Sequence, residues 1–145
     1  MRGVSIPVTD GLTLAGDEWG DPSGPPVLML HGAGQNRHAW KNTARILADD
    51  GWFVLTVDAR GHGDSDWSLD SFYDIDHTGA DVLSLIERFD RAPVVIGASM
   101  GGMAALAAQD LYAGQPFEAL VLVDIAPGFA FDGASRIISF MAGNP

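Results

Sequence analysis

The chain has 145 residues, of which 47% are apolar and 19% charged, a composition typical of one globular domain with its own core. Its net charge of −11 would repel phosphate backbones, which argues against nucleic acid as a partner. Cysteine is absent, which excludes disulfides, thiolate metal sites and a cysteine nucleophile. The sequence has neither a signal-peptide pattern nor an apolar run of membrane-spanning length, so we expect a cytoplasmic protein without a membrane partner.

The predicted elements alternate between strands and helices along the chain. Residues 3–19 alternate in polarity around Asp10-Gly11 and predict an antiparallel hairpin. Short apolar runs typical of strands buried on both faces follow at residues 27–30, 53–57, 94–96 and 119–123. Helical patterns fill the gaps at residues 40–47, 82–89 and 100–112. The fold class is therefore α/β, a mostly parallel sheet with helices on both faces.

A G-x-S-x-G motif, Gly97 to Gly101, lies between the run at 94–96 and the helical segment that follows. Such a motif is weak by itself, but a sharp strand-to-helix turn would force Ser99 into strained backbone angles and lift its hydroxyl above the sheet edge. Small neighbours on both sides make that turn feasible. Ser99 is the candidate nucleophile, and the alternative is a packing turn with an incidental serine.

A glycine-rich loop, His31-Gly32-Ala33-Gly34, directly follows the run at 27–30. Acyl transfer needs two N–H donors aimed at the tetrahedral oxyanion, and the natural pair is the backbone N–H groups of Ala33 and Met100. The alternative is a connection that needs glycine only for its shape. The candidate substrate-binding residues around this loop are Gly32, Gly34, His38 and Met100.

The segment from Asp58 to Ser65 is interpreted as a structural turn, in which Asp58 and Arg60 pair and cap the bend. His62 is a candidate base by residue type only, because it lies in this turn and not at the expected position of a base.

These three motifs, followed by Leu122-Val123-Asp124, resemble the α/β-hydrolase superfamily in order and spacing. The nearest resemblance is to its lipase and esterase, cofactor-free perhydrolase and carbon–carbon hydrolase branch. The resemblance implies that Ser99 is the nucleophile, that Ala33 and Met100 form the oxyanion hole, and that no cofactor or metal is needed. It implies a small-molecule acyl or ester substrate. Asp124 matches a position that supplies the triad acid in a few branches, whereas more often an acid there is structural.

The chain departs from the family because the triad order is serine, acid, histidine, whereas all four histidines precede Ser99. We expect residues 1–128 to form the N-terminal part of the hydrolase core, before its last strands, and residues 129–145 to begin a cap, with a helix from Ser135. Alone, the chain should then be almost inactive. The edge of the strand at 119–123 would pair with the missing C-terminal half or with a second copy.

The predicted function is hydrolysis of a carboxylic ester or related acyl substrate through an acyl-enzyme at Ser99. A cofactor-free perhydrolase or haloperoxidase would use the same residues. A non-catalytic ligand-binding scaffold of the same fold is the third alternative.

Overall fold

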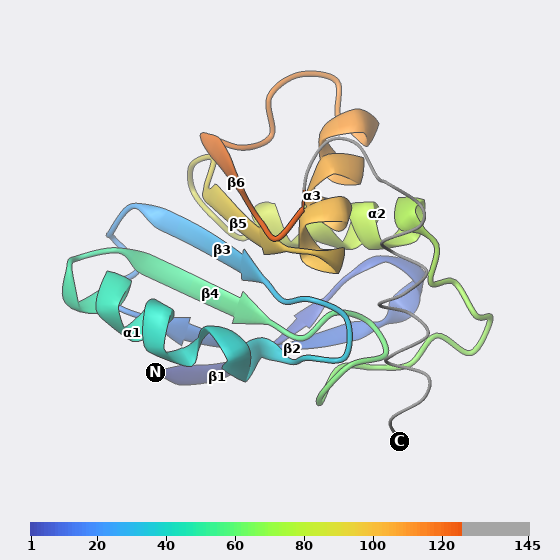
Figure 1. The fold of residues 1–145 in the computed structure, drawn as a ribbon, viewed down its shortest axis with the longest axis horizontal. Helices are drawn as coiled ribbons and strands as arrows, with labels where there is room; N and C mark the ends of the chain where they lie inside the picture. The colour runs from blue at the N-terminus through green and yellow to red at the C-terminus, as the bar shows by residue number, and fades with distance from the viewer. Residues whose placement is uncertain (126–145) are drawn as a thin grey trace.

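The computed structural model describes residues 1–125, so the expected cap segment 129–145 and its helix lie outside the described residues. In this part of the chain, six strands form one sheet in the order β1-β2-β4-β3-β5-β6 (Figure 1). Their bounds are β1 Arg2–Pro7, β2 Thr13–Trp19, β3 Pro26–Leu30, β4 Phe53–Val57, β5 Val94–Ala98 and β6 Ala119–Val123. β2 runs antiparallel to β1 and β4, and every other pairing is parallel. The predicted hairpin and the mostly parallel sheet are confirmed.

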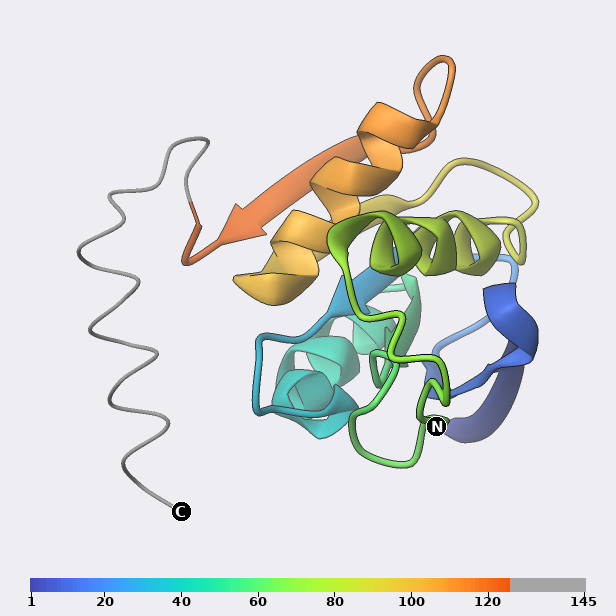
Figure 2. The ribbon, with the colours of Figure 1, turned by 90° about the vertical axis from the view of Figure 1, so that its right-hand side faces the viewer.

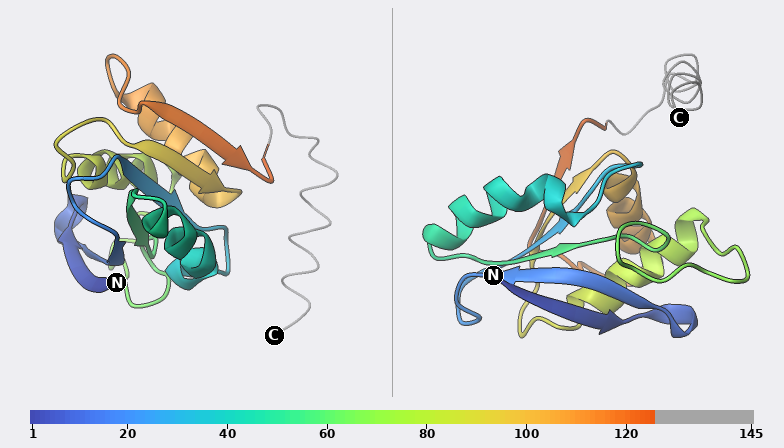
Figure 3. Two further views of the ribbon diagram at one scale, coloured as in Figure 1. Left: turned by 90° about the vertical axis from the view of Figure 1, so that its left-hand side faces the viewer. Right: turned by 90° about the horizontal axis from the view of Figure 1, so that it is seen from below.

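Within residues 1–125, three α-helices cover the sheet, with α1 (Lys41–Asp49) on one face and α2 (Ile75–Ile86) with α3 (Met100–Leu111) on the other (Figures 1 and 3). Figure 2 shows α2 and α3 side by side on their face. The Asp74 carboxylate caps the N-terminus of α2 by accepting backbone N–H bonds from Asp76 and His77. None of the helices within residues 1–125 is long and apolar enough to cross a membrane.

Each face of the sheet has its own apolar core, because side chains alternate along the strands. In β3, Leu28 and Leu30 belong to the core under α2 and α3, whereas Val27 and Met29 belong to the core under α1. A strand with apolar residues at every position therefore has two buried faces, as the continuous apolar runs predict.

β6 is an edge strand of the sheet, at the opposite edge from β1. Within residues 1–125 it pairs only with β5, and Val121 and Val123 are 44% and 38% exposed. Its paired edge joins it to β5, the strand that leads to Ser99, and its free edge faces away from β5.

Candidate active site

Ser99 lies in the turn between β5 and α3, with φ 45° and ψ −110°. Non-glycine residues avoid this region, so the turn is strained, as the motif predicts. The turn is held on two sides: the Ser99 N–H donates to the Val123 carbonyl of β6 at 2.9 Å, and the Gly101 N–H donates to the His31 carbonyl at 3.1 Å. Ser99 itself is exposed. The result is an accessible hydroxyl on a backbone fixed by two neighbouring segments.

Two glycines of the motif are required by space alone. A Cβ on Gly97 would lie 2.7 Å from the Gly101 carbonyl oxygen and from the nitrogen and Cα of Gly102. A Cβ on Gly101 would lie 2.6 Å from the Leu30 carbonyl oxygen. All these neighbours are backbone atoms, so no side-chain rotation would relieve the overlap.

The loop after β3 is shaped by a buried histidine. The His31 Nδ1–H donates to the Gly32 carbonyl at 2.8 Å, and His31 Nε2 accepts the Ala59 N–H at 3.0 Å. A carbonyl only accepts, so these bonds fix the tautomer with the proton on Nδ1. Burial lowers the pKa of His31, despite the opposing effect of the Gly32 carbonyl. His31 is therefore a neutral anchor of the loop, and both its nitrogens are occupied.

The backbone donors of the predicted oxyanion hole are available. Within residues 1–125, neither the Ala33 N–H nor the Met100 N–H has a hydrogen-bond acceptor. Gly32 is fixed by contrast, because its N–H donates to Gln35 Oε1 at 3.1 Å and its carbonyl accepts the Gln35 N–H at 3.2 Å. Met100 also begins α3, where the helix dipole favours developing negative charge.

A groove of about 420 Å³ brings the loop and the turn together. It is lined by Gly32, Ala33, Gln35, Ala39, Trp40, Ala98, Ser99, Val123 and Asp124. Asp124, which follows β6 with φ 54°, is the only carboxylate among these residues, and no histidine is among them. Within residues 1–125 no group of three or more potential metal ligands occurs. One cavity therefore contains the Ser99 hydroxyl, the backbone of Gly32 and Ala33 and the Asp124 carboxylate, but no imidazole.

Other predicted site residues lie elsewhere. The His38 imidazole lies 3.7 Å from the Asp17 carboxylate and outside the groove lining, whereas Trp40, two residues further along, lines the groove. Met100 lines a cavity between the sheet and helices α2 and α3. Gly34, with φ 71° and open space around it, shapes the loop. Substrate binding by three residues therefore stays a prediction, and none of the three lines the groove: His38, Gly34 and Met100.

The predicted pairing of Asp58 with Arg60 is wrong. The Asp58 side chain is fully buried, and it pairs with the Arg37 guanidinium and accepts the Asp64 N–H. Arg60, 2% exposed, forms two 2.7 Å hydrogen bonds to Asp81 on α2 and another ion pair to Asp10 at 3.0 Å. The segment is structural, as interpreted, but its charges bind other elements and not each other.

His62 packs against His31 with ring centroids 5.2 Å apart, and its Nδ1 lies 3.1 Å from the Arg60 carbonyl. It is outside the groove lining. Arg37, which no motif singles out, ties the loop after β3 to Asp58, and it also contacts Asp17 at 3.2 Å. Arg37 and these two carboxylate partners are far apart in the sequence, so no local motif predicts these ion pairs.

Comparisons with known proteins agree with this geometry. The α/β-hydrolase fold family model matches residues 25–140. The chain is 36% identical over 125 residues to the sn-1-specific diacylglycerol lipase ABHD11 of Mus musculus, covering 85% of this chain and 39% of the lipase. It is 35% identical over 99 residues to the non-heme chloroperoxidase of Streptomyces lividans, covering 68% of this chain and 36% of that protein.

Among solved structures, the esterase EaEST of Exiguobacterium antarcticum superposes with a TM-score of 0.83 at 26% identity, covering 99% of this chain and 57% of the esterase. The chain thus spans well under half the length of the curated relatives named above. The family-model match covers most of the sequence, and the sheet order and the turn at Ser99 agree with it. The chain belongs to the α/β-hydrolase fold family.

Proposed function

We propose that this chain carries the nucleophile and oxyanion hole of a serine hydrolase acting on carboxylic esters or related acyl compounds. The observation that carries the proposal is the backbone of Ser99, held at φ 45° on a strand-to-helix turn with its hydroxyl at an open groove. Such strain persists only where surrounding structure imposes it, and it occurs preferentially at functional sites. The names of the lipase and esterase relatives support the same reaction class.

In the proposed reaction the Ser99 oxygen attacks the substrate carbonyl carbon while a base takes the hydroxyl proton. The carbonyl oxygen becomes an oxyanion, which the N–H groups of Ala33 and Met100 stabilise. The alcohol leaves with a proton from the same base, and water then releases the acid from the acyl-enzyme. Gly32 lies directly beside the nucleophile, because a Cβ at this position would be in van der Waals contact with the Ser99 Cβ, at 3.6 Å.

The imidazole base is the component that the groove lacks, since no histidine lines it and none follows Ser99 in the sequence. Asp124 is the candidate to orient such a base, because it lies in the groove beside Ser99. Loss of a triad base lowers kcat by roughly a million-fold in a serine hydrolase. We therefore expect the chain alone to hydrolyse esters very slowly.

A second candidate reaction uses the same acyl-enzyme with hydrogen peroxide in place of water, which yields a peracid. The chloroperoxidase relative supports it. Peracid formation from acetate and hydrogen peroxide, compared with acetate ester hydrolysis in the same preparation, separates the two reactions.

The test is covalent labelling of the chain by a fluorophosphonate, followed by intact mass and peptide mapping. Imidazole added at rising concentration supplies the missing base in solution, so labelling at Ser99 should accelerate in proportion to neutral imidazole. Ser99→Ala should abolish it. Ser71→Ala is the matched control, because Ser71 also has a positive φ of 60° but lies outside the groove lining.

Labelling at Ser99 that depends on imidazole in the wild type and in Ser71→Ala would support the hydrolase. Equal labelling of wild type and Ser99→Ala, at every imidazole concentration and in folded samples, would refute it and favour a ligand-binding scaffold.

A further inference from the structure

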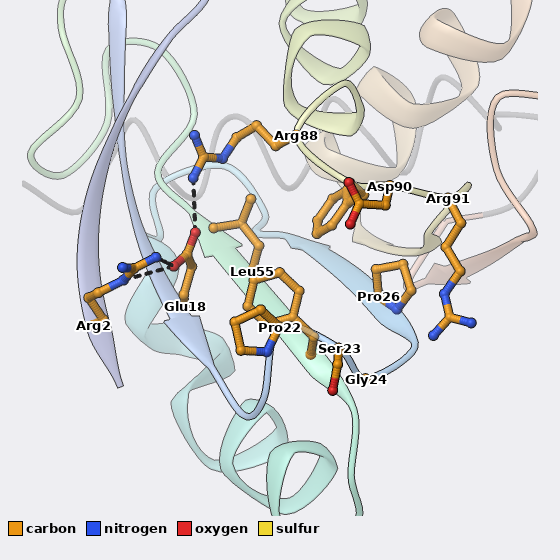
Figure 4. A pocket seen from close by; sticks show the side chains of 12 residues that line it. Arg2, Glu18, Pro22, Ser23, Gly24, Pro26, Leu55, Arg88, Asp90 and Arg91 are labelled. Atoms are coloured by element: carbon orange, nitrogen blue, oxygen red, sulfur yellow. Dashed lines mark hydrogen bonds and ion pairs between the residues drawn. The ribbon is translucent and has the colours of Figure 1, made fainter.

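Another cavity, of about 340 Å³ (Figure 4), lies at the opposite end of the sheet from Ser99. It opens where β3 and β4 begin, at Pro26 and Phe53, whereas Ser99 follows the carboxyl end of β5. Nothing in the proposed reaction uses it.

One side of this cavity is an ion triad. Glu18, whose side chain is only 8% exposed, accepts a 3.0 Å hydrogen bond from Arg2 Nε and a 2.9 Å bond from Arg88 Nη2. Burial opposes ionisation, but the bonds from the two guanidinium groups outweigh it and lower the pKa of Glu18. The carboxylate is thus ionised at neutral pH, and the triad has one net positive charge. Most guanidinium N–H donors of both arginines are not used by Glu18.

The other side of the cavity is Arg91. Figure 4 shows it across the cavity from Glu18, and it has no ion pair within residues 1–125. Its neighbour Asp90 also lines the cavity, which leaves the lining with three arginines against two carboxylates. A positive site is exceptional in a chain of net charge −11. The lining of this cavity therefore attracts anions, although the chain as a whole has a net negative charge.

Between these two sides the floor is apolar. Phe53 and Phe89 meet edge to face with centroids 6.0 Å apart, and Leu55, Pro22 and Pro26 complete the lining. A cavity of this size that combines an apolar floor with convergent polar groups is typical of small-molecule sites. The floor favours a ligand with a flat apolar body, and the guanidinium groups favour a carboxylate, which they can bind through two N–H groups.

From this combination we infer that the cavity is a binding site for an aryl carboxylate. The carboxylate pairs with Arg91, and the ring lies on Phe53 and Phe89. The site is independent of the proposed hydrolysis, because it shares no lining residue with the groove at Ser99.

The test is titration calorimetry of the whole chain with 2-naphthoate, and with the neutral 2-naphthamide as the matched ligand. The naphthoate should bind at least about tenfold more tightly than the amide, because a hydrogen-bonded charge contributes on that scale. Arg91→Gln should weaken naphthoate binding about tenfold or more. Arg45→Gln removes the same charge from a 62% exposed site on α1 and should leave binding unchanged.

Glu18→Gln is the most discriminating variant, because it leaves the guanidinium groups of Arg2 and Arg88 at the cavity without a carboxylate partner. Naphthoate binding should become severalfold tighter in this variant. Equal binding by wild type and Arg91→Gln, no binding at millimolar naphthoate, or weaker binding by folded Glu18→Gln would each overturn the site. Since Arg91 is exposed, its variant remains informative even if Glu18→Gln fails to fold.

Discussion

Gly97→Ala tests whether the turn at Ser99 depends on the close contact between β5 and the start of α3. The added methyl would lie 2.7 Å from three backbone atoms of Gly101 and Gly102, whereas ordinary contacts begin near 3.4 Å. The first turn of α3 would have to move by about 0.7 Å to accept it. Overpacking of this kind costs about 1–3 kcal/mol, a large part of the stability of a single domain.

Urea unfolding followed by circular dichroism measures this cost. With a slope of about 2 kcal/mol/M, the midpoint of Gly97→Ala should fall by about 0.5–1.5 M. Gly3→Ala is the matched control, because a Cβ there would have only Asp17 Oδ1 nearby, at 3.8 Å. Its midpoint should stay near that of the wild type. A Gly97→Ala midpoint equal to that of Gly3→Ala would refute the steric reasoning about the turn.

Three further predictions follow from the described contacts. Ser99→Gly should raise the free energy of unfolding by about 1 kcal/mol, because glycine adopts φ 45° without strain, and the same urea assay measures it. Asp81→Asn should lower it by about 3–5 kcal/mol, since the buried Arg60 guanidinium loses its two 2.7 Å charged bonds; thermal melting checks this, and a loss below 1 kcal/mol would contradict it. The pKa of His31 is lower in the folded chain than in the unfolded chain. As pH falls below about 6.5, the unfolded chain therefore binds a proton at His31 before the folded chain does, and the free energy of unfolding should decline until pH reaches the folded pKa. His31→Gln should flatten the dependence of the urea midpoint on pH between about 7.5 and 5.5, and a curve unchanged from that of the wild type would show that this proton is not linked to folding.

Much of the fold is predictable from local pattern, because strands buried on both faces are continuously apolar and the three helices have apolar stripes. The turn at Ser99 is predictable for a related reason. Its glycines are demanded by contacts within a few residues, so the motif and its flanking elements contain the relevant information.

The buried charge pairs could not be predicted from the sequence, because the two partners of each pair come from different elements. Asp58 and Arg60 are two residues apart, yet Asp58 pairs with Arg37 before α1, and Arg60 pairs with Asp81 on α2. The same limit applies to His38. Its proximity to the glycine-rich loop suggested the groove, whereas its imidazole lies next to Asp17 of β2. Proximity along a turn does not determine the direction of a side chain.

The two backbone hydrogen bonds that hold the turn at Ser99 also protect it against local unfolding. The amides of Ser99 and Gly101 donate to β6 and to the segment after β3, so they exchange with solvent only when those contacts separate. Hydrogen exchange at these two amides should therefore be slow, although the neighbouring hydroxyl faces water. The proposed nucleophile would then be attached to a part of the backbone that is protected from local unfolding.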